Sequence, residues 1–436
     1  MGAGFVAGPF VRYFLGKPDY KVRVGDLDLK KAQRIIKAHP RGEALRLDLR
    51  DEASLSKEIL ESDIVVSLVP YAFHPFIAKL CIRLKKNMVT TSYAGEPIKS
   101  LDEEAQKSEI AILNEVGLDP GIDHMEAARI IHEVKARGEQ ILGFSSYCGG
   151  LPAPDANNNP FGYKFSWSPR GVLLAGKSAA RYLKDGQQVF VPSDSLFGHP
   201  AMISIEGLGE FEIYPNRDSL PYIKLYGIPE TKTLYRGTLR YPGWCKILEK
   251  ISQLGLLDET EKNLKGLTYR EFMKVQLGTA PEKDIRKALA LKLDIEPESD
   301  IIHRLEWLGL LGEDPIPLDR GSALDILETR MLAKLRYQPG ESDMIVLRHD
   351  FLTTSPGSKK QKIISTLVNY GIPNGDSAMA RTVGLPAAIS TRLILEGKIR
   401  AKGVLIPVQP EIYEPVLDEL REHGIVFKQE RKIVEA

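Results

Sequence analysis

The sequence predicts an α/β fold whose first part is a doubly wound parallel sheet. Two observations lead to this class. Over residues 20–121, short runs rich in Val, Ile and Leu alternate with longer amphipathic stretches, and a G-x-G-x-x-A motif stands at the start of the chain. Because such sheets bind ligands beyond the carboxyl ends of their strands, a cofactor should lie against the loops that follow the strands.

The elements of this first part can be placed in order. The expected strands cover 21–25, 44–49, 63–69, 87–91 and 110–114. Between them, helices are expected over 29–38, 55–61, 74–85 and 98–108. Further along, residues 115–124 form a loop that enters a helix ending near Arg137, and residues 244–334 carry apolar side chains at helical spacing.

Composition narrows the class of protein. The 436 residues include 59 Lys and Arg and 58 Asp and Glu, which gives a net charge of +1. The chain therefore lacks the excess of basic residues that is typical of proteins that bind nucleic acid. No apolar run approaches the roughly 18 to 20 residues of a membrane helix, and the first residues do not resemble a secretion signal. We therefore expect a cytoplasmic protein with neither a nucleic acid nor a membrane as partner.

The three cysteines are widely scattered along the chain. Cys81, Cys148 and Cys245 form no CxxC pair. Neither a disulfide framework nor a zinc site is therefore expected, and we expect no bound metal.

The motif at the chain start predicts a dinucleotide site. Gly2 and Gly4 would allow a tight turn and the close approach of a pyrophosphate, and Phe5 and Val6 continue this loop into a helix. Asp26 directly follows the first expected strand, at the spacing of the acid that accepts hydrogen bonds from a ribose hydroxyl.

The same region bears on the choice of dinucleotide. An acid such as Asp26 repels a 2′-phosphate and no arginine follows it immediately, so NAD is favoured. Asp28 is an alternative ribose ligand, or the N-cap of the next helix. NADP stays possible because of three basic residues on that helix: Lys30, Lys31 and Arg34.

Two further sets of residues are assigned to the cofactor. Asp48, near the end of the 44–49 strand, is either a partner for the adenine amino group or a surface carboxylate. The nicotinamide side is expected to be lined by the residues that end the 63–69 strand, which are Leu68, Val69 and Pro70.

The strand that should precede the glycine motif is missing from the chain. In this fold the first strand is central and buried on both faces. We therefore expect the natural protein to begin several residues earlier, with a short apolar strand before Gly2.

After residue 114 the sequence carries blocks of Gly, Pro and Asn interleaved with aromatic and charged residues, which suit pocket walls better than a core. At these blocks the chain resembles the glutamate-forming saccharopine dehydrogenases, also called saccharopine reductases. Besides the glycine motif, the matching stretches are 67–71, 89–93, 117–124, 147–154, 163–171, 214–219 and 236–241, with weaker matches at 377–380 and 402–405. The resemblance spans nearly the whole chain.

The resemblance implies a reversible NAD(P)-linked reaction of lysine metabolism. In one direction glutamate condenses with 2-aminoadipate 6-semialdehyde, and hydride reduces the resulting imine to saccharopine. The resemblance also implies a homodimer with three structural parts. These are a Rossmann domain over 1–123 with a return segment at about 376–400, a mixed α/β substrate and dimer domain over 124–242 and about 335–375, and a helical insertion over 243–334.

Saccharopine carries three carboxylates and a secondary amine, so its pocket needs cations and hydrogen-bond donors. Arg217 is the first choice, because its planar fork can grip a carboxylate while Asn216 beside it donates a further hydrogen bond. Gly149 is assigned to the same pocket. Three further cations are candidates, each equally well explained by an internal ion pair: Lys164, Arg236 and Arg240.

Proton transfer is required when the amine adds to the aldehyde and when water leaves. The resemblance draws attention to Asp119 as a proton shuttle, with a turn-capping Asx residue as the alternative. Tyr93 would orient the substrate or simply pack, and Cys148 would act as a weak acid or be an inert thiol. His74 and His124, at expected helix starts, are less favoured. No covalent catalysis is expected, because hydride transfer to an imine needs no nucleophile.

Two rival functions stay open. A polyamine-forming enzyme of the homospermidine or carboxynorspermidine synthase type would need acidic residues for a polycation, and would leave Asn216 and Arg217 without a carboxylate to bind. A non-catalytic nucleotide-binding regulator would explain the glycine motif but not the 148–154 and 163–167 blocks.

Overall fold

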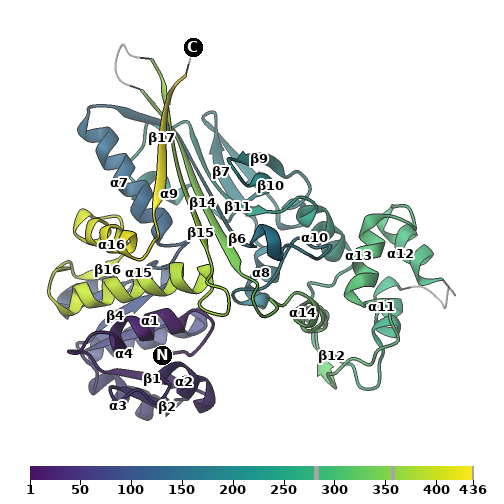
Figure 1. The fold of residues 1–436 in the computed structure, drawn as a ribbon, viewed down its shortest axis with the longest axis horizontal. Coiled ribbons are helices and arrows are strands. Elements are labelled where there is room, and N and C mark those ends of the chain that lie inside the picture. The colour runs from purple at the N-terminus through teal and green to yellow at the C-terminus, as the bar shows by residue number, and fades with distance from the viewer. Residues whose placement is uncertain (279–283, 355–358, 435–436) are drawn as a thin grey trace. The chain divides into compact units, whose positions relative to one another are not determined.

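The computed structural model of the chain describes residues 1–278, 284–354 and 359–434 (Figure 1). It divides into two compact units. Unit 1 comprises Met1–Leu142, Lys224–Glu230 and Leu347–Ala436, and unit 2 comprises Gly143–Ile223 and Thr231–Val346. The strands β6 (Gln140–Pro152) and β14 (Asp343–Thr354) and the short helix α9 (Pro221–Leu225) each contain a boundary between the units.

A parallel sheet forms the first part of unit 1, as the alternating sequence pattern predicts. Strands β16, β5, β4 and β3 lie side by side in that order, and β1 pairs with β2 in a separate parallel ladder. The bounds are β1 Val22–Asp26, β2 Gly42–Arg46, β3 Ile64–Ser67, β4 Asn87–Thr90, β5 Ala111–Leu113 and β16 Gly403–Leu405. All five expected strands are confirmed, with small shifts at their ends.

The first two residues join these two ladders. The amino group of Met1 donates to the carbonyl oxygen of Val66 at 2.7 Å, and the Met1 carbonyl accepts from Leu68 N–H at 2.9 Å. On the other side, Gly2 N–H donates to the carbonyl of Gly25 at 2.8 Å. This backbone therefore lies between β1 and β3, where a doubly wound sheet has its central strand. The earlier natural start stays a prediction.

Helices connect these strands, and a returning segment adds another. The connecting helices are α1 Ala7–Leu15, α2 Leu29–Ile36, α3 Glu52–Leu60, α4 His74–Arg83, α5 Glu96–Lys99 and α6 Asp102–Lys107, with a 3-10 turn η1 at Tyr71–Phe73. Much later in the chain, α15 (Ala378–Leu395) packs beside α1 (Figure 1). A Cβ at Gly384 would lie 2.8 Å from the carbonyl oxygen of Val6, so a larger residue would force the two helices apart.

A buried apolar cluster stabilises this sheet and its helices. Leu55 and Ile59 contribute from α3, Ile77 from α4, and Met88 and Ile112 from β4 and β5. Leu55 and Ile59 are four residues apart, the spacing that places both on one face of a helix. Each buried side chain of this kind contributes roughly 1.5 to 3 kcal/mol relative to exposure.

The remaining elements of unit 1 follow β5 and close the chain. Helix α7 (Ile122–Ala136) begins after the 115–121 loop, as expected, and packs on α16 (Pro410–Glu422). Strands β15 (Gln361–Tyr370) and β17 (Phe427–Ile433) are antiparallel. Glu126 of α7 is buried, pairs with Arg129 at 2.7 Å and accepts a hydrogen bond from Ser365 of β15 at 2.6 Å. These bonds anchor α7.

Unit 2 contains a mixed sheet. Strand β6 pairs in parallel with β11 (Thr233–Arg240), which is antiparallel to β10 (Gly209–Pro215), and β10 is antiparallel to β9 (Ala201–Ile205). Strand β7 (Ala180–Lys184) pairs with β11 and with β8 (Gln187–Val191). Two 3-10 turns lie at η2 (Pro154–Ala156) and η3 (Ser193–Ser195). The register places Thr238 between Cys148 and Tyr214 on the neighbouring strands.

A helical segment follows β11 in unit 2. It contains α10 Trp244–Gln253, α11 Tyr269–Leu277, α12 Ile285–Leu293, α13 Asp300–Leu308 and α14 Ala323–Lys334, with the short strands β12 Lys262–Asn263 and β13 Arg320–Gly321. The apolar residues whose spacing predicts helices are all buried in one core cluster: Leu248, Ile251, Leu254, Ile301, Leu305 and Leu308. The helical character of this segment is confirmed.

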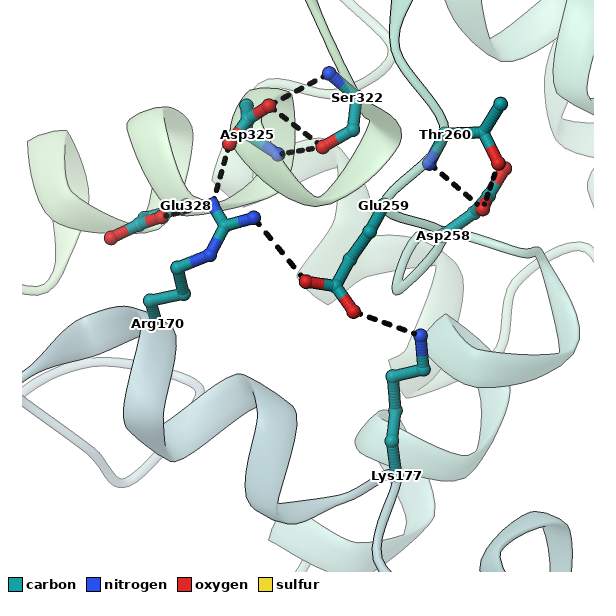
Figure 2. Close-up of polar contacts among 8 residues, drawn as sticks. All are labelled: Arg170, Lys177, Asp258, Glu259, Thr260, Ser322, Asp325 and Glu328. Atoms are coloured by element: carbon teal, nitrogen blue, oxygen red, sulfur yellow. Dashed lines mark hydrogen bonds and ion pairs between the residues drawn. The ribbon is translucent and has the colours of Figure 1, made fainter. Parts of the chain in front are cut away.

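An ionic network joins two helices of unit 2 (Figure 2). Arg170 of α8 (Pro169–Ala175) contacts Asp325 of α14 at 2.6 Å and Glu259 at 3.5 Å, and Glu259 also pairs with Lys177 at 3.4 Å. Asp325 accepts the backbone N–H of Ser322 at 2.8 Å, completing a capping box at the start of α14. This backbone hydrogen bond and Arg170 lower the pKa of Asp325. The network ties α8, which directly follows the 163–168 block, to the helical segment.

Candidate active site

The glycine turn before α1 has the geometry of a phosphate cradle. Gly2 has φ 90°, and a Cβ there would lie 2.6 Å from the carbonyl oxygen of Leu68, so glycine is required. A Cβ at Gly4 would meet no atom within 4 Å, which leaves room for a ligand beside that backbone. Phe5 is 66% exposed and Val6 is half-buried, directly before a helix N-terminus that favours anions. These residues fit the pyrophosphate of a dinucleotide.

Asp26 holds this turn to the start of α2. Its Oδ2 accepts the backbone N–H of Ala3 at 2.8 Å, and its Oδ1 accepts the N–H of Asp28 at 2.9 Å. Both carboxylate oxygens therefore have a backbone partner. This structural role accounts for an aspartate at position 26 even if it binds no ribose hydroxyl. Of the two interpretations of Asp28, the N-cap is confirmed, because its side chain accepts the N–H of Lys30 at 2.9 Å.

Asp48 follows β2 and pairs with Arg50. The Arg50 guanidinium donates to Asp48 Oδ1 at 3.0 Å and to Oδ2 at 2.7 Å. These bonds lower the pKa of Asp48 to about 2. This pair fits the surface carboxylate among the two interpretations of Asp48. Arg50, which the sequence did not single out, has a side chain that is 76% exposed and places a cation after β2.

The residues after β3 lie next to the glycine turn. Leu68 and Val69 are half-buried, and a side-chain carbon of Val69 lies 3.4 Å from the position of a Cβ on Gly2. Pro70 is exposed, and Tyr71 beyond it is 81% exposed. The structure therefore brings together two segments that the sequence assigned to the cofactor.

His74 joins the ends of β3 and β4. Its Nδ1 lies 2.9 Å from Ser67 Oγ, and its Nε2 lies 2.8 Å from Ser92 Oγ and 3.3 Å from Thr90 Oγ1. Burial lowers the pKa of His74 to about 4, so the ring is neutral at physiological pH. A neutral, hydrogen-bonded imidazole fits a structural role better than acid–base catalysis.

Two of the residues assigned to proton transfer are in contact. The hydroxyl of Tyr93, after β4, donates to Asp119 Oδ1 at 3.1 Å, and both side chains are half-buried. Asp119 lies in the loop between β5 and α7. A phenol and a carboxylate in this arrangement can hold and pass a proton.

Cys148, the third residue assigned to proton transfer, lies on β6 in unit 2. It is buried, and the residue opposite it on the neighbouring strand β11 is Thr238. A Cβ at Gly149 would lie 2.7 Å from the carbonyl oxygen of Leu239, so Gly149 permits close packing of β6 on β11.

The Asn216 and Arg217 pair forms the turn after β10. The N–H of Asn216 donates to the carbonyl of Arg236 at 2.8 Å, and Arg217 is exposed with φ 54°. A non-glycine residue in this left-handed conformation stores strain, which is common at functional sites. Arg236 is buried and stacks its guanidinium on the ring of Tyr222 at 4.4 Å.

Lys164 has a counter-ion within unit 2. Its ammonium lies 2.5 Å from Glu341 Oε2 and 5.8 Å from the centre of the Tyr337 ring. The side chain is 4% exposed. The sequence left two interpretations of Lys164 open, a substrate ligand and an internal ion pair. The buried contact with Glu341 favours the ion pair.

Arg240 is a buried cation held by aromatic rings. Its guanidinium lies 5.1 Å from the ring centre of Tyr163 and 5.6 Å from that of Trp244, and one nitrogen donates to the carbonyl of Leu239 at 2.7 Å. Within the described parts of the chain, no carboxylate pairs with Arg240 and its Nε has no hydrogen-bond partner. Arg240 lies two residues beyond Thr238, so both side chains share one face of β11.

Over residues 1–278, 284–354 and 359–434, no group of three or more His, Cys, Asp and Glu side chains could hold a metal ion. None of the helices described there is long and apolar enough to span a bilayer.

Comparisons with known proteins now identify the family. Two family models match: the saccharopine dehydrogenase NADP binding domain over residues 1–113, and the saccharopine dehydrogenase C-terminal domain over residues 117–425. The chain is 40% identical over 438 residues to the NADP(+)-linked, L-glutamate-forming saccharopine dehydrogenase of Saccharomyces cerevisiae, covering 98% of each protein. It is 37% identical over 447 residues to the mitochondrial alpha-aminoadipic semialdehyde synthase of Bos taurus, covering 99% of this chain and 47% of that protein.

The comparisons do not support the preference for NAD. The matching nucleotide-domain model is described as NADP binding, and the yeast relative is named for NADP(+). The preference rested on the charge of Asp26, and in the structure this charge is bonded to two backbone N–H groups. A carboxylate used in this way is a poor marker of cofactor type.

Solved structures agree with the sequence comparisons. The apo histidine-tagged saccharopine dehydrogenase (L-Glu forming) from Saccharomyces cerevisiae matches with a TM-score of 0.89 at 39% identity, covering 99% of this chain and 98% of that one. The homospermidine synthase of Legionella pneumophila shares the fold, with a TM-score of 0.56 at 11% identity over 99% of this chain and 90% of that one. The predicted α/β fold with a Rossmann-like domain is confirmed, and the chain belongs to the saccharopine dehydrogenase family.

Proposed function

We propose that this chain is an NADP-linked saccharopine dehydrogenase that forms L-glutamate. In this reaction the secondary amine of saccharopine is oxidised to an imine, and water then splits the imine into glutamate and 2-aminoadipate 6-semialdehyde. The reverse direction forms saccharopine and releases water. The observation that carries the proposal is the hydrogen bond from Tyr93 to Asp119, in a chain that is 40% identical to the yeast enzyme along 98% of both proteins.

The cofactor would be held by the glycine turn and by basic side chains near it. NADP supplies the hydride acceptor when it is bound. Gly4 leaves open space for the pyrophosphate, and Arg50 is an exposed cation after β2. A 2′-phosphate needs such cations. The candidates for this role are Lys30, Lys31, Arg34 and Arg50.

Asp119 and Tyr93 would manage charge and protons at the amine. The negative charge of the Asp119 carboxylate stabilises a cationic iminium. When water attacks the iminium carbon, the carboxylate accepts a proton from that water. The Tyr93 hydroxyl, 3.1 Å from Asp119 Oδ1, keeps this carboxylate in one orientation. Cys148 stays a candidate weak acid in this proposal.

Unit 2 would supply the cations that bind the three substrate carboxylates. Arg217, exposed on a left-handed turn beside Asn216, is the first of them. Arg236 lies in the next strand, and Arg240 has no carboxylate partner among the described residues. A bidentate arginine contact to each carboxylate would discriminate saccharopine from amines without carboxylates.

The domain division and the dimer also belong to this proposal. Residues 1–123 with about 376–400 would bind the cofactor, residues 124–242 with about 335–375 would bind substrate and the second subunit, and residues 243–334 would form the insertion. Light scattering coupled to size-exclusion chromatography would measure the mass, and a monomer at micromolar concentration would contradict the dimer.

An assay with saccharopine and each dinucleotide tests the proposed function. We expect saccharopine-dependent formation of NADPH that is faster than formation of NADH, with glutamate as a product. Turnover of diamines in place of saccharopine would favour the polyamine-forming alternative. Nucleotide binding without turnover of either substrate would favour a regulator.

A further inference from the structure

A buried polar chain in unit 1 lies beside the Tyr93 and Asp119 pair. Glu115 Oε2 lies 2.7 Å from His124 Nε2, and His124 Nδ1 lies 2.7 Å from the hydroxyl of Tyr226. The three residues are 3%, 0% and 6% exposed. Because a carboxylate only accepts hydrogen bonds, His124 Nε2 is the donor to Glu115. The other ring nitrogen, Nδ1, lies beside the Tyr226 hydroxyl and 3.9 Å from Asp123 Oδ2. Burying such groups costs free energy unless they are hydrogen-bonded, and each of these three side chains has a partner within the chain.

Glu115 contacts the backbone on both sides of Tyr93. Its N–H donates to the carbonyl of Ser92 at 3.1 Å, and its Oε1 accepts the N–H of Ala94 at 2.9 Å. Tyr93 is the single residue between these two contacts. Glu115 has φ 60°, a left-handed backbone conformation that is strained for a non-glycine residue. The double contact needs this turn of the backbone.

His124 connects the same carboxylate to the helix that follows Asp119. It lies in the first turn of α7, and the loop before this helix is closed by the Gly117 N–H, which donates to the carbonyl of Pro120 at 2.9 Å. The imidazole therefore joins the segment that carries Tyr93 to the segment that carries Asp119.

We propose that Glu115, supported by His124 and Tyr226, is a positioning residue for the hydroxyl of Tyr93 against Asp119. It acts through the backbone of Ser92 and Ala94, and it does not touch the substrate or the cofactor. The inference rests on the proposed function, because it gives Tyr93 and Asp119 their role in the reaction. It extends that function by naming the group that sets their 3.1 Å contact.

Two substitutions at Glu115 separate positioning from charge. Glu115→Ala removes both side-chain contacts, and we expect kcat to fall by about 10- to 100-fold, since small displacements of a reacting group cost this much. Glu115→Gln keeps an oxygen that accepts the Ala94 N–H and leaves an amide group of the same size beside His124 Nε2. We expect Glu115→Gln to keep kcat within about 5-fold of the wild type. Both variants should bind NADPH normally.

A double-mutant cycle with Tyr93→Phe tests whether Glu115 acts through Tyr93. We expect Glu115→Ala to lower kcat by less than about 3-fold further in the Tyr93→Phe background, because the group that it positions is already absent. Glu126→Gln is the matched control. Glu126 is a second buried carboxylate, on α7, and its partners are Arg129 and Ser365. The Glu126→Gln variant should keep kcat within about 2-fold of the wild type, even if the substitution lowers the free energy of unfolding.

Three results would overturn the proposal. They are a Glu115→Ala variant with wild-type kcat, a fall in kcat that is fully additive with Tyr93→Phe, and a Glu126→Gln variant that loses kcat to the same extent. A fluorine NMR measurement that needs no substrate distinguishes failure of this inference from failure of the proposed function. With 3-fluorotyrosine incorporated, Glu115→Ala should shift the fluorine resonance that Tyr93→Phe removes, and Glu126→Gln should not. An unmoved resonance contradicts the inference even in a protein that does not oxidise saccharopine.

Discussion

Gly4 offers a test in which folding stability and cofactor binding should change in opposite directions. The Cβ of Gly4→Ala would meet no protein atom within 4 Å, and the backbone there is not left-handed. The substitution should therefore raise the free energy of unfolding by about 0.4 to 1 kcal/mol, because it restricts the unfolded chain. The same methyl group would occupy the space proposed for the pyrophosphate. Loss of one charge-assisted hydrogen bond, worth roughly 1.5 to 3 kcal/mol, would weaken NADPH binding about 10- to 100-fold.

Urea denaturation and a fluorescence titration with NADPH measure the two effects on the same protein. Gly2→Ala is the control, because its Cβ would lie 2.6 Å from the carbonyl oxygen of Leu68 and its φ is 90°. It should lose stability and binding together. A Gly4→Ala protein that binds NADPH as tightly as the wild type would refute the placement of the pyrophosphate, and one that is destabilised would refute the open space beside Gly4.

Four further outcomes are expected. Arg217→Ala should raise the KM for saccharopine about 10- to 100-fold in steady-state assays, as the loss of a charge-assisted contact implies, and an unchanged KM would remove Arg217 from the pocket. Asp119→Asn should lower kcat and leave the dissociation constant of NADPH unchanged, whereas an equal loss of both would indicate a structural turn. Burial lowers the pKa of His74 from 6.5 to about 4, so the unfolded chain takes up this proton more readily, and the free energy of unfolding should rise by about 3 kcal/mol between pH 4 and pH 6.5. His74→Gln should lack this contribution in urea titrations, and equal pH slopes would contradict it. Ser322→Ala should cost about 1 kcal/mol of stability by removing the N-cap of α14, and an unchanged urea midpoint would show that the cap contributes nothing.

The sheet of unit 1 could be predicted from the sequence because its signals are local. Strands buried on both faces are continuous apolar runs, and the helices between them repeat their apolar residues at a different period. Ile59 and Ile77 are buried where these patterns place them. The same reasoning found helices over residues 244–334, where Leu248 and Leu305 are buried. Neither result depends on contacts between distant segments.

The roles of polar residues could not be predicted in the same way, because their partners are distant in the sequence. Asp26 has the spacing of a ribose ligand, but the backbone N–H of Ala3 shares its carboxylate. Glu115 gives no sign in the sequence of a left-handed backbone, and its chain of contacts reaches Tyr226, more than a hundred residues away. In the sequence, Asp26 and Glu115 share only one local feature, which is a carboxylate directly after an expected buried strand. This feature does not distinguish a ligand-binding carboxylate from one that binds backbone N–H groups.

The nucleotide-binding part of the chain is completed by residues near its other end. β16 supplies the strand beside β5, and α15 covers α1 through the close approach at Gly384. A nascent chain therefore cannot finish this part until the ribosome has passed Leu405. Until then, the edge of β5 and the apolar side of α1 are open to aggregation, which makes them targets for chaperones during synthesis.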